Sequence, residues 1–141
     1  MKIEGLIKEL RKKGYKVTPQ RLAISEFILS NKNHLTAEEI YEEIKKKFPS
    51  ISISTIYQVL RLLTSLGKIN ELKFVDNKSR YESDVTPHIN AICPKCGNIE
   101  DYYSQNIEEF MLKIKQEFKF EPISHRIDIY RYCVKCESLL V

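Results

Sequence analysis

Residues 80–101 read Arg-Tyr-Glu-Ser-Asp-Val-Thr-Pro-His-Ile-Asn-Ala-Ile-Cys-Pro-Lys-Cys-Gly-Asn-Ile-Glu-Asp. Carboxylates, a histidine, an amide and a Cys-x-x-Cys knuckle follow one another in this segment. The residues before it have the pattern of a basic helical module, and those after it the pattern of an acidic module of helices and strands. A segment that joins two unlike halves and carries metal-binding side chains is a natural place for a switch.

The composition indicates a folded protein of one domain or two small ones. The chain has 141 residues, of which 43% are hydrophobic, near the average for globular proteins. No apolar run approaches the roughly 18 residues that a membrane span needs, and the first residues lack the apolar region of a signal peptide. We therefore expect a cytoplasmic protein with no membrane partner.

Charge is unevenly spread along the chain. Residues 1–80 hold 16 Lys and Arg against 9 Asp and Glu, a net charge of +7, whereas residues 81–141 hold 7 against 10, a net charge of −3. This asymmetry suggests that only the front half meets a polyanion. Solvated charged helices would give a similar pattern, so charge alone does not decide the partner.

The front half is predicted to contain four short helices and a β-hairpin. Thr18-Pro19 starts the second helix, Thr36 and Glu39 form a capping box for the third, and Gly67 ends the fourth. Residues 69–82 then have the alternation and turn residues of a hairpin. This order describes a winged helix-turn-helix, in which one helix enters the major groove of DNA and the hairpin touches the backbone.

The fourth predicted helix has one apolar face and one polar face without acids. The polar face consists of Ser54, Tyr57, Gln58, Arg61 and Ser65. Such side chains suit phosphates and base edges, and an ordinary solvated helix face is the alternative. The missing carboxylates and the net charge of +7 favour DNA.

The back half is predicted to form a small α+β module. Strands at residues 89–93 and 99–103 flank the first knuckle, and an amphipathic helix follows with the stripe Ile107, Phe110, Met111, Ile114 and Phe118. A long strand then runs from Ile123 through Tyr130 into the second knuckle. A module of this size is small for an independent core, so we expect it to need zinc, a partner subunit or both.

All four cysteines lie in this half, as the pairs Cys93/Cys96 and Cys133/Cys136. In a reducing compartment two Cys-x-x-Cys turns favour metal over a disulfide framework. Together they complete a tetrahedral zinc site with four thiolates and no open position, so the predicted role is structural. Two buried reduced pairs or a redox dithiol are the alternatives.

His88 has further ligand types near it in the sequence, and these are Glu82, Asp84, Asn90 and Asp101. They are candidates for a second metal site, although a lone histidine is more often structural. His34 lies in a loop of the front half and His125 on the last predicted strand. Sequence alone brings neither of them to His88.

Taken together, the motifs resemble those of the ferric uptake regulator (Fur) superfamily. They are Val17-Thr-Pro-Gln-Arg21, His34-Leu-Thr-Ala-Glu-Glu-Ile-Tyr41, Ser54-Thr-Ile-Tyr57 and the two cysteine pairs, in register from about Gly14 to Cys136. The resemblance implies a homodimeric metal-dependent transcription regulator that acts as a repressor. It implies a winged helix-turn-helix domain at residues 1–82 and an α/β dimerisation and metal-binding domain at residues 83–141.

The resemblance also implies the roles of single residues. The four cysteines become the structural zinc site, and a regulatory Fe²⁺ or Mn²⁺, with Zn²⁺ possible, is expected at the hinge between the domains. Its ligands would be His34, Glu82, His88, Asn90 and Asp101. The expected DNA contacts are Lys16, Ser54, Thr55, Tyr57, Gln58 and Arg61, with Lys16 matching a lysine that enters the minor groove.

The chain departs from the family's usual pattern at Asn90, Pro87 and Ile89. Asn90 stands at the second histidine of a His-x-His motif, and an amide oxygen is a weaker, harder ligand than imidazole. It is expected to favour Fe²⁺ or Mn²⁺ over zinc-like ions, or to disable the site. Asp101 is an aspartate, as in the peroxide-sensing branch. A further metal site of the family is expected to be lost, because Pro87 and Ile89 replace polar ligands. His125 matches another ligand of that site and is then left without the remaining ones.

We expect metal binding to draw the two domains together and to set two winged helices at the spacing of a palindromic operator. Peroxide sensing through oxygen addition to His34 or His88 is a second version, and zinc sensing a third. A zinc-stapled interaction module without DNA binding and a thiol oxidoreductase are rivals from other classes. No triad, phosphate loop or acid/base pair indicates a hydrolase, so we do not expect an enzyme.

Overall fold

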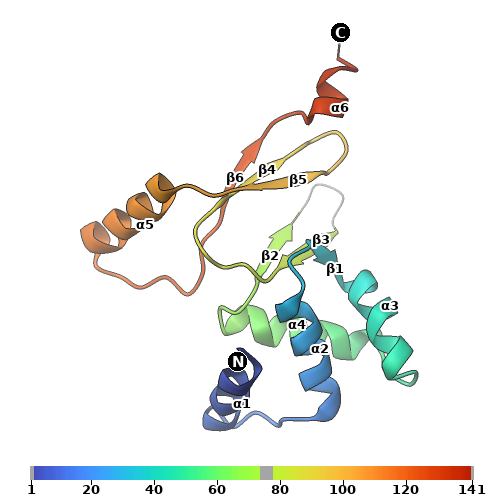
Figure 1. Ribbon diagram of the computed structural model, residues 1–141. Helices are drawn as coiled ribbons and strands as arrows, with labels where there is room; N and C mark the ends of the chain where they lie inside the picture. Colours follow the sequence, from blue (N-terminus) through green and yellow to red (C-terminus); the bar gives the residue numbers. More distant parts are fainter. Residues whose placement is uncertain (1, 74–77, 141) are drawn as a thin grey trace. The chain divides into compact units, whose positions relative to one another are not determined.

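The computed structural model describes residues 2–73 and 78–140. The chain divides into two compact units, Met1–Asp84 and Val85–Val141. The predicted domain boundary followed Glu82, two residues before this division. Figure 1 shows that the first unit is mainly helical and that the second contains a sheet and two helices.

Four helices make up most of the first unit: α1 Lys2–Lys12, α2 Pro19–Ser30, α3 Ala37–Lys47 and α4 Ile53–Ser65. The predicted caps are confirmed. The Thr18 side chain accepts from the backbone of Arg21, and both hydrogen bonds of the capping box between Thr36 and Glu39 are present. Gly67 follows α4 with φ 68°, the left-handed geometry that ends a helix without strain at glycine.

The helices of the first unit enclose one hydrophobic core. Its most deeply buried members include Leu10, Ile24, Ile40, Ile56 and Leu63. The apolar face of α4 is buried as predicted, through Ile56, Val59, Leu60 and Leu63. Burying this stripe leaves the opposite face of α4 toward solvent.

A three-stranded sheet closes the first unit, with strands β1 Leu35–Thr36, β2 Asn70–Lys73 and β3 Ser79–Glu82 in the order β1-β3-β2. The predicted hairpin of β2 and β3 is confirmed. Phe74 and part of the predicted turn lie outside the described residues. The two-residue strand β1 was not predicted. It pairs antiparallel with β3, Leu35 facing Tyr81, so the adjacent His34 comes opposite Glu82.

The second unit contains β4 Ile89–Ile92, β5 Ile99–Tyr102, α5 Gln105–Phe118, β6 Ile127–Tyr130 and α6 Val134–Glu137. Its sheet has the order β5-β4-β6, with β4 antiparallel to β5 and parallel to β6. A parallel neighbour requires a crossover connection, and α5 lies in that connection. The central strand β4 thus faces a different partner along each edge.

The long final strand predicted from Ile123 is wrong. Strand β6 begins at Ile127, which pairs with Ile89 at the start of β4, and Ile123 is 77% exposed. A strand extends only as far as its partner does, and Pro87, without a backbone N–H, precedes β4. His125 therefore lies before the last strand rather than on it, and the short helix α6 at the second knuckle was not predicted.

The predicted apolar stripe of α5 exists, but no residue of the helix is buried in the single chain. Phe110 is 55% exposed and Phe118 59%. In Figure 1, α5 lies beyond the end of its sheet rather than across a sheet face. Other large exposed apolar side chains of this unit include Val85, Tyr102, Tyr103, Leu112, Phe120, Ile129, Tyr130, Tyr132, Val134, Leu139 and Leu140.

Candidate metal centres and nucleic-acid interface

The four cysteines converge, although they lie at the two ends of the second unit's sequence. Cys93 directly follows β4. Cys133 is the residue before α6, and Cys136 lies within that helix. All four sulfur atoms are within 4.8 Å of one another, and those of Cys96 and Cys133 are 3.7 Å apart. Four Zn–S bonds of about 2.3 Å in a tetrahedron would hold sulfurs about 3.8 Å apart. The cluster fits a structural zinc ion.

The backbone of the first knuckle shapes the thiol positions. Gly97 has φ 78°, and its N–H donates to the carbonyl of Cys93 at 2.9 Å, which closes the turn. Backbone N–H groups, first that of Cys133, lower the pKa of the Cys93 thiol to about 6. Burial raises the pKa of Cys136 to about 12. Burying several thiolates together is costly, and a bound dication offsets that cost.

A pair of ligand types meets at the end of the first unit. His34 Nε2 lies 3.2 Å from Glu82 Oε2, and Asn70 Nδ2 donates to Glu82 Oε1 at 3.3 Å. Glu82 is only 3% exposed. The pairing of β1 with β3 positions the histidine, which the sequence pattern had left in a loop. A nitrogen and a carboxylate oxygen, both possible metal ligands, thus lie close together at one edge of this sheet.

A second group of ligand types lies at the start of the second unit, around His88. Because the Thr86 carbonyl can only accept a hydrogen bond, His88 Nδ1 carries a proton and donates to it at 2.7 Å. The other ring nitrogen, Nε2, lies 3.1 Å from Asn90 Oδ1 and 3.9 Å from Asp101 Oδ1. The β4–β5 register, which places Asn90 opposite Asp101, brings these oxygens to the same nitrogen.

Asp128 is a residue that the sequence analysis did not single out. It pairs with Asn90 across the parallel β4–β6 register and accepts a hydrogen bond from Asn90 Nδ2 at 3.2 Å. Sequence offered no indication of this contact, because nothing local to residue 128 specifies which residue of β4 it faces. His125 lies three positions earlier, half-buried before β6.

The polar face of α4 carries most of the predicted DNA contacts. Ser54, Gln58 and Arg61 are exposed. Thr55 is half-buried, and its hydroxyl lies 3.0 Å from that of the N-cap residue Ser52, so part of its hydrogen-bonding capacity serves the helix start. Lys16 is exposed in the segment before α2, where its carbonyl accepts from the Arg21 guanidinium.

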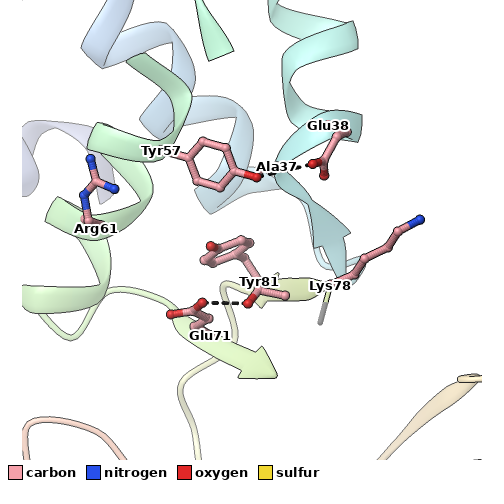
Figure 2. A pocket seen from close by; sticks show the side chains of 8 residues that line it. Ala37, Glu38, Tyr57, Arg61, Glu71, Lys78 and Tyr81 are labelled. Atoms are coloured by element: carbon pink, nitrogen blue, oxygen red, sulfur yellow. Dashed lines mark hydrogen bonds between the residues drawn. The ribbon is translucent and has the colours of Figure 1, made fainter. Parts of the chain in front are cut away.

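Two acids from other elements border this face. Glu38 of α3 and Glu71 of β2 line a cavity of about 340 Å³ together with Tyr57, Arg61 and Tyr81 (Figure 2). Tyr57 donates to Glu38 Oε1 at 3.3 Å. Burial and the nearby Glu71 raise the pKa of Tyr81 to about 12, so it stays neutral. The face is acid-free along α4 but not around it.

The model of the ferric uptake regulator family matches residues 12–130. The chain belongs to this family. The peroxide-responsive repressor PerR of Staphylococcus epidermidis is 38% identical over 136 residues, which cover 96% of this chain and 91% of that protein. Members of the family are regulators rather than enzymes, and this chain is a metal- or peroxide-sensing transcriptional regulator.

Solved structures agree with the family assignment. The ferric uptake regulator of Helicobacter pylori, described as having three functional metal-binding sites, matches with a TM-score of 0.75 and 28% identity over 96% of this chain and 91% of that one. That of Pseudomonas aeruginosa with manganese matches with a TM-score of 0.74 and 26% identity over 90% and 96%. Among the described residues, no helix is both long and apolar enough to cross a membrane.

Proposed function

We propose that the protein is a metal-dependent repressor that binds operator DNA as a homodimer and takes Fe²⁺ or Mn²⁺ at a hinge. One observation carries this proposal. His34 and Glu82 meet at the end of the first unit, and His88 meets Asn90 and Asp101 at the start of the second. The boundary between the units falls between these two groups. Each group alone is a partial ligand set.

A metal ion bound by both groups would supply a positive charge that the ligand atoms of both groups attract. His34 and Glu82 would present a nitrogen and a buried carboxylate from the first unit. His88 Nε2, Asn90 Oδ1 and the Asp101 carboxylate would present the remaining donors from the second. Because the full set exists only when the units are closed, the ion would favour the closed form by its differential affinity for it.

The domain predicted at residues 1–82, which makes up most of the first unit, would act as a winged helix-turn-helix. In this arrangement α3 and α4 form the helix pair, and β2 and β3 form the wing. Ser54, Thr55, Tyr57, Gln58 and Arg61 of α4 would reach bases and phosphates, with Lys16 on the backbone or in the minor groove. The hydrogen bond of Tyr57 to Glu38 supports a fixed position for that ring. A protein that binds operator DNA in this way would act in the cytoplasm.

The domain predicted at residues 83–141, which includes the whole second unit, would hold the dimer together. Its exposed apolar side chains lie on α5 and beyond β6, and a cluster of exposed apolar side chains commonly marks an interface. A second copy of the chain would cover this surface, and the structural zinc at the four cysteines would hold the strand ends. A dimer of two winged helices would match a palindromic operator.

The ligand set supports Fe²⁺ or Mn²⁺ over Zn²⁺ as the regulatory ion. Asn90 and Asp101 offer hard oxygen donors around His88, and such donors suit Mn²⁺ and Fe²⁺. Zinc sensing is the competing outcome. Operator binding by the protein with its four-cysteine site filled, titrated with each ion in turn, would separate them, since a response to Zn²⁺ but not to Mn²⁺ or Fe²⁺ would contradict this choice.

Peroxide sensing is a second candidate function, favoured by the 38% identity to a peroxide-responsive repressor and by Asp101. Hydrogen peroxide would oxidise the iron-loaded protein so that one peroxide oxygen joins the ring of His34 or His88 and the other leaves as water. Mass spectrometry after mild peroxide treatment would find 16 mass units added to one of these residues, a mass shift of about one oxygen atom. An unmodified peptide from both sites would contradict this candidate.

The proposed function is tested by His34→Ala. Fluorescence anisotropy on the upstream DNA, at fixed salt with and without Mn²⁺, should show that the wild type tightens about tenfold or more, roughly 1.4 kcal/mol of coupling. The variant should lose this response and keep its zinc and its dimer. A variant that still responds to Mn²⁺ would contradict the hinge site.

A further inference from the structure

Three polar side chains form a row across the sheet of the second unit. Asn90, at the centre on β4, is opposite Asp101 on β5 and opposite Asp128 on β6. Asn90 is 1% exposed, so its amide has no water to turn to. The nitrogen and the oxygen of that amide therefore depend on neighbouring side chains, which are Asp128 and His88.

The amide nitrogen has a charged acceptor. Asn90 Nδ2 donates to Asp128 Oδ1 at 3.2 Å, and the other oxygen of Asp128 accepts from Arg126 Nε at 2.7 Å. The carboxylate is thus divided, with one oxygen for the arginine and one for the amide. Its side chain is 16% exposed, so this contact is largely shielded from water.

The amide oxygen faces His88 Nε2 at 3.1 Å. Because Nδ1 donates its proton to Thr86, Nε2 of the neutral ring holds a lone pair, and this lone pair faces an oxygen. His88 Nε2 and Asn90 Oδ1 both attract a cation, which can be a proton on Nε2 or a metal ion. Rotating the amide by half a turn would remove the conflict at His88, since Nδ2 would then donate to Nε2.

That rotation is opposed by Asp128. It would bring Asn90 Oδ1 against a carboxylate oxygen, which can only accept hydrogen bonds, and would leave this partly buried oxygen without the N–H that donates to it. The arrangement with the oxygen toward His88 is therefore set on β6, by a residue that does not face His88.

We propose that Asp128 is a positioning residue, held by Arg126, that keeps the Asn90 oxygen turned toward His88 Nε2 and so creates a donor pair for a hard divalent cation. The inference rests on the proposed regulatory site and deepens it. Without Asp128 the amide turns, its NH₂ group caps the Nε2 lone pair, and a group that cannot bind a metal occupies the place of a ligand.

The test is a titration of zinc-loaded protein with Mn²⁺ in the absence of DNA, following free Mn²⁺ by electron paramagnetic resonance. Asp128→Ala should weaken Mn²⁺ binding about tenfold or more, as losing an outer contact of a ligand commonly does. Asn90→Asp with Asp128→Ala should restore it, because a carboxylate presents an oxygen whichever way it turns. Zinc content and circular dichroism show that the variants are folded.

Asp128→Asn, nearly isosteric, serves if the alanine variant does not fold, and should weaken Mn²⁺ binding less. Unchanged Mn²⁺ affinity in Asp128→Ala would overturn the inference, as would a loss that Asn90→Asp does not restore. Either result would leave the hinge proposal standing, since His34→Ala tests that separately.

A second readout needs no regulatory metal. In nuclear magnetic resonance of the zinc-loaded protein, the Asn90 side-chain NH₂ protons should show no contact with the His88 ring in the wild type and a clear one in Asp128→Ala. The same contact in both proteins would overturn the inference. A wild type that takes up no Mn²⁺ beyond its zinc would count against the proposed function, while this comparison still decides the role of Asp128.

Discussion

The two units of the chain differ in how they bury their apolar residues. The first encloses a core of its own, in which Ile24, Ile40 and Leu63 are fully buried. The second buries no residue of its longest helix and leaves Phe110 and Phe118 more than half exposed. A helix with an apolar stripe and no cover needs something beyond its own unit. We therefore expect the first unit to fold by itself and the second to need zinc and a partner subunit.

The largest expected effect comes from removing zinc from the second unit. Cys96→Ser should abolish zinc binding, a contribution of about 10–16 kcal/mol in zinc-dependent folds. The second unit should unfold while the first remains folded. Zinc content and limited proteolysis would measure this, and a stable fragment near residues 2–84 is the expected product. Loss of both units together would show that they do not fold separately.

Leu60→Ala should destabilise the first unit and leave the second unchanged. Leu60 is 1% exposed, and truncating a buried leucine costs about 2–5 kcal/mol through lost burial and the cavity left behind. Denaturant unfolding followed by helical circular dichroism would measure the loss, with zinc content as the control for the second unit. A loss of zinc in this variant would contradict the independence of the two units.

Phe110→Ala should affect association rather than folding. Burying a phenylalanine in an interface contributes about 1.5–3 kcal/mol, so the dimer dissociation constant should rise about tenfold or more. Sedimentation equilibrium would measure it. Tyr15→Ala, which removes an exposed aromatic ring of the first unit, is the matched control and should leave the dimer unchanged. Equal effects of both variants would remove the contrast between the units.

The smallest effect is expected from the helix caps. Thr36→Ala removes a capping box in the first unit, and Ser104→Ala removes the N-cap of α5, where Ser104 Oγ accepts from Asn106 N at 3.2 Å. Losing such a cap costs about 0.5–2 kcal/mol. Thermal unfolding should show Thr36→Ala lowering the stability of the first unit and Ser104→Ala that of the second only. The reverse assignment would contradict it.

Some expectations failed where a segment needed a partner to define it. The alternation around Ile123 resembles a strand, but β4 offers no backbone opposite it, so β6 starts at Ile127. The polar face of α4 has no acid in its own sequence, yet Glu38 and Glu71 border it from α3 and β2. A pattern within one segment describes that segment and not its neighbours.

The sequence by itself determined the helix starts at Thr18 and Thr36, the faces of α4 and the zinc-type spacing of the cysteines, because caps, periodicity and knuckles act over a few residues. Only the tertiary structure decided that His34 meets Glu82 through the two-residue strand β1, and that Asn90 lies between Asp101 and Asp128. The contacts of His34 with Glu82 and of Asn90 with Asp128 depend on the register between strands far apart in the chain. No short turn joins these strands, so turn geometry does not set their register, and it follows from how the apolar faces of the whole unit pack.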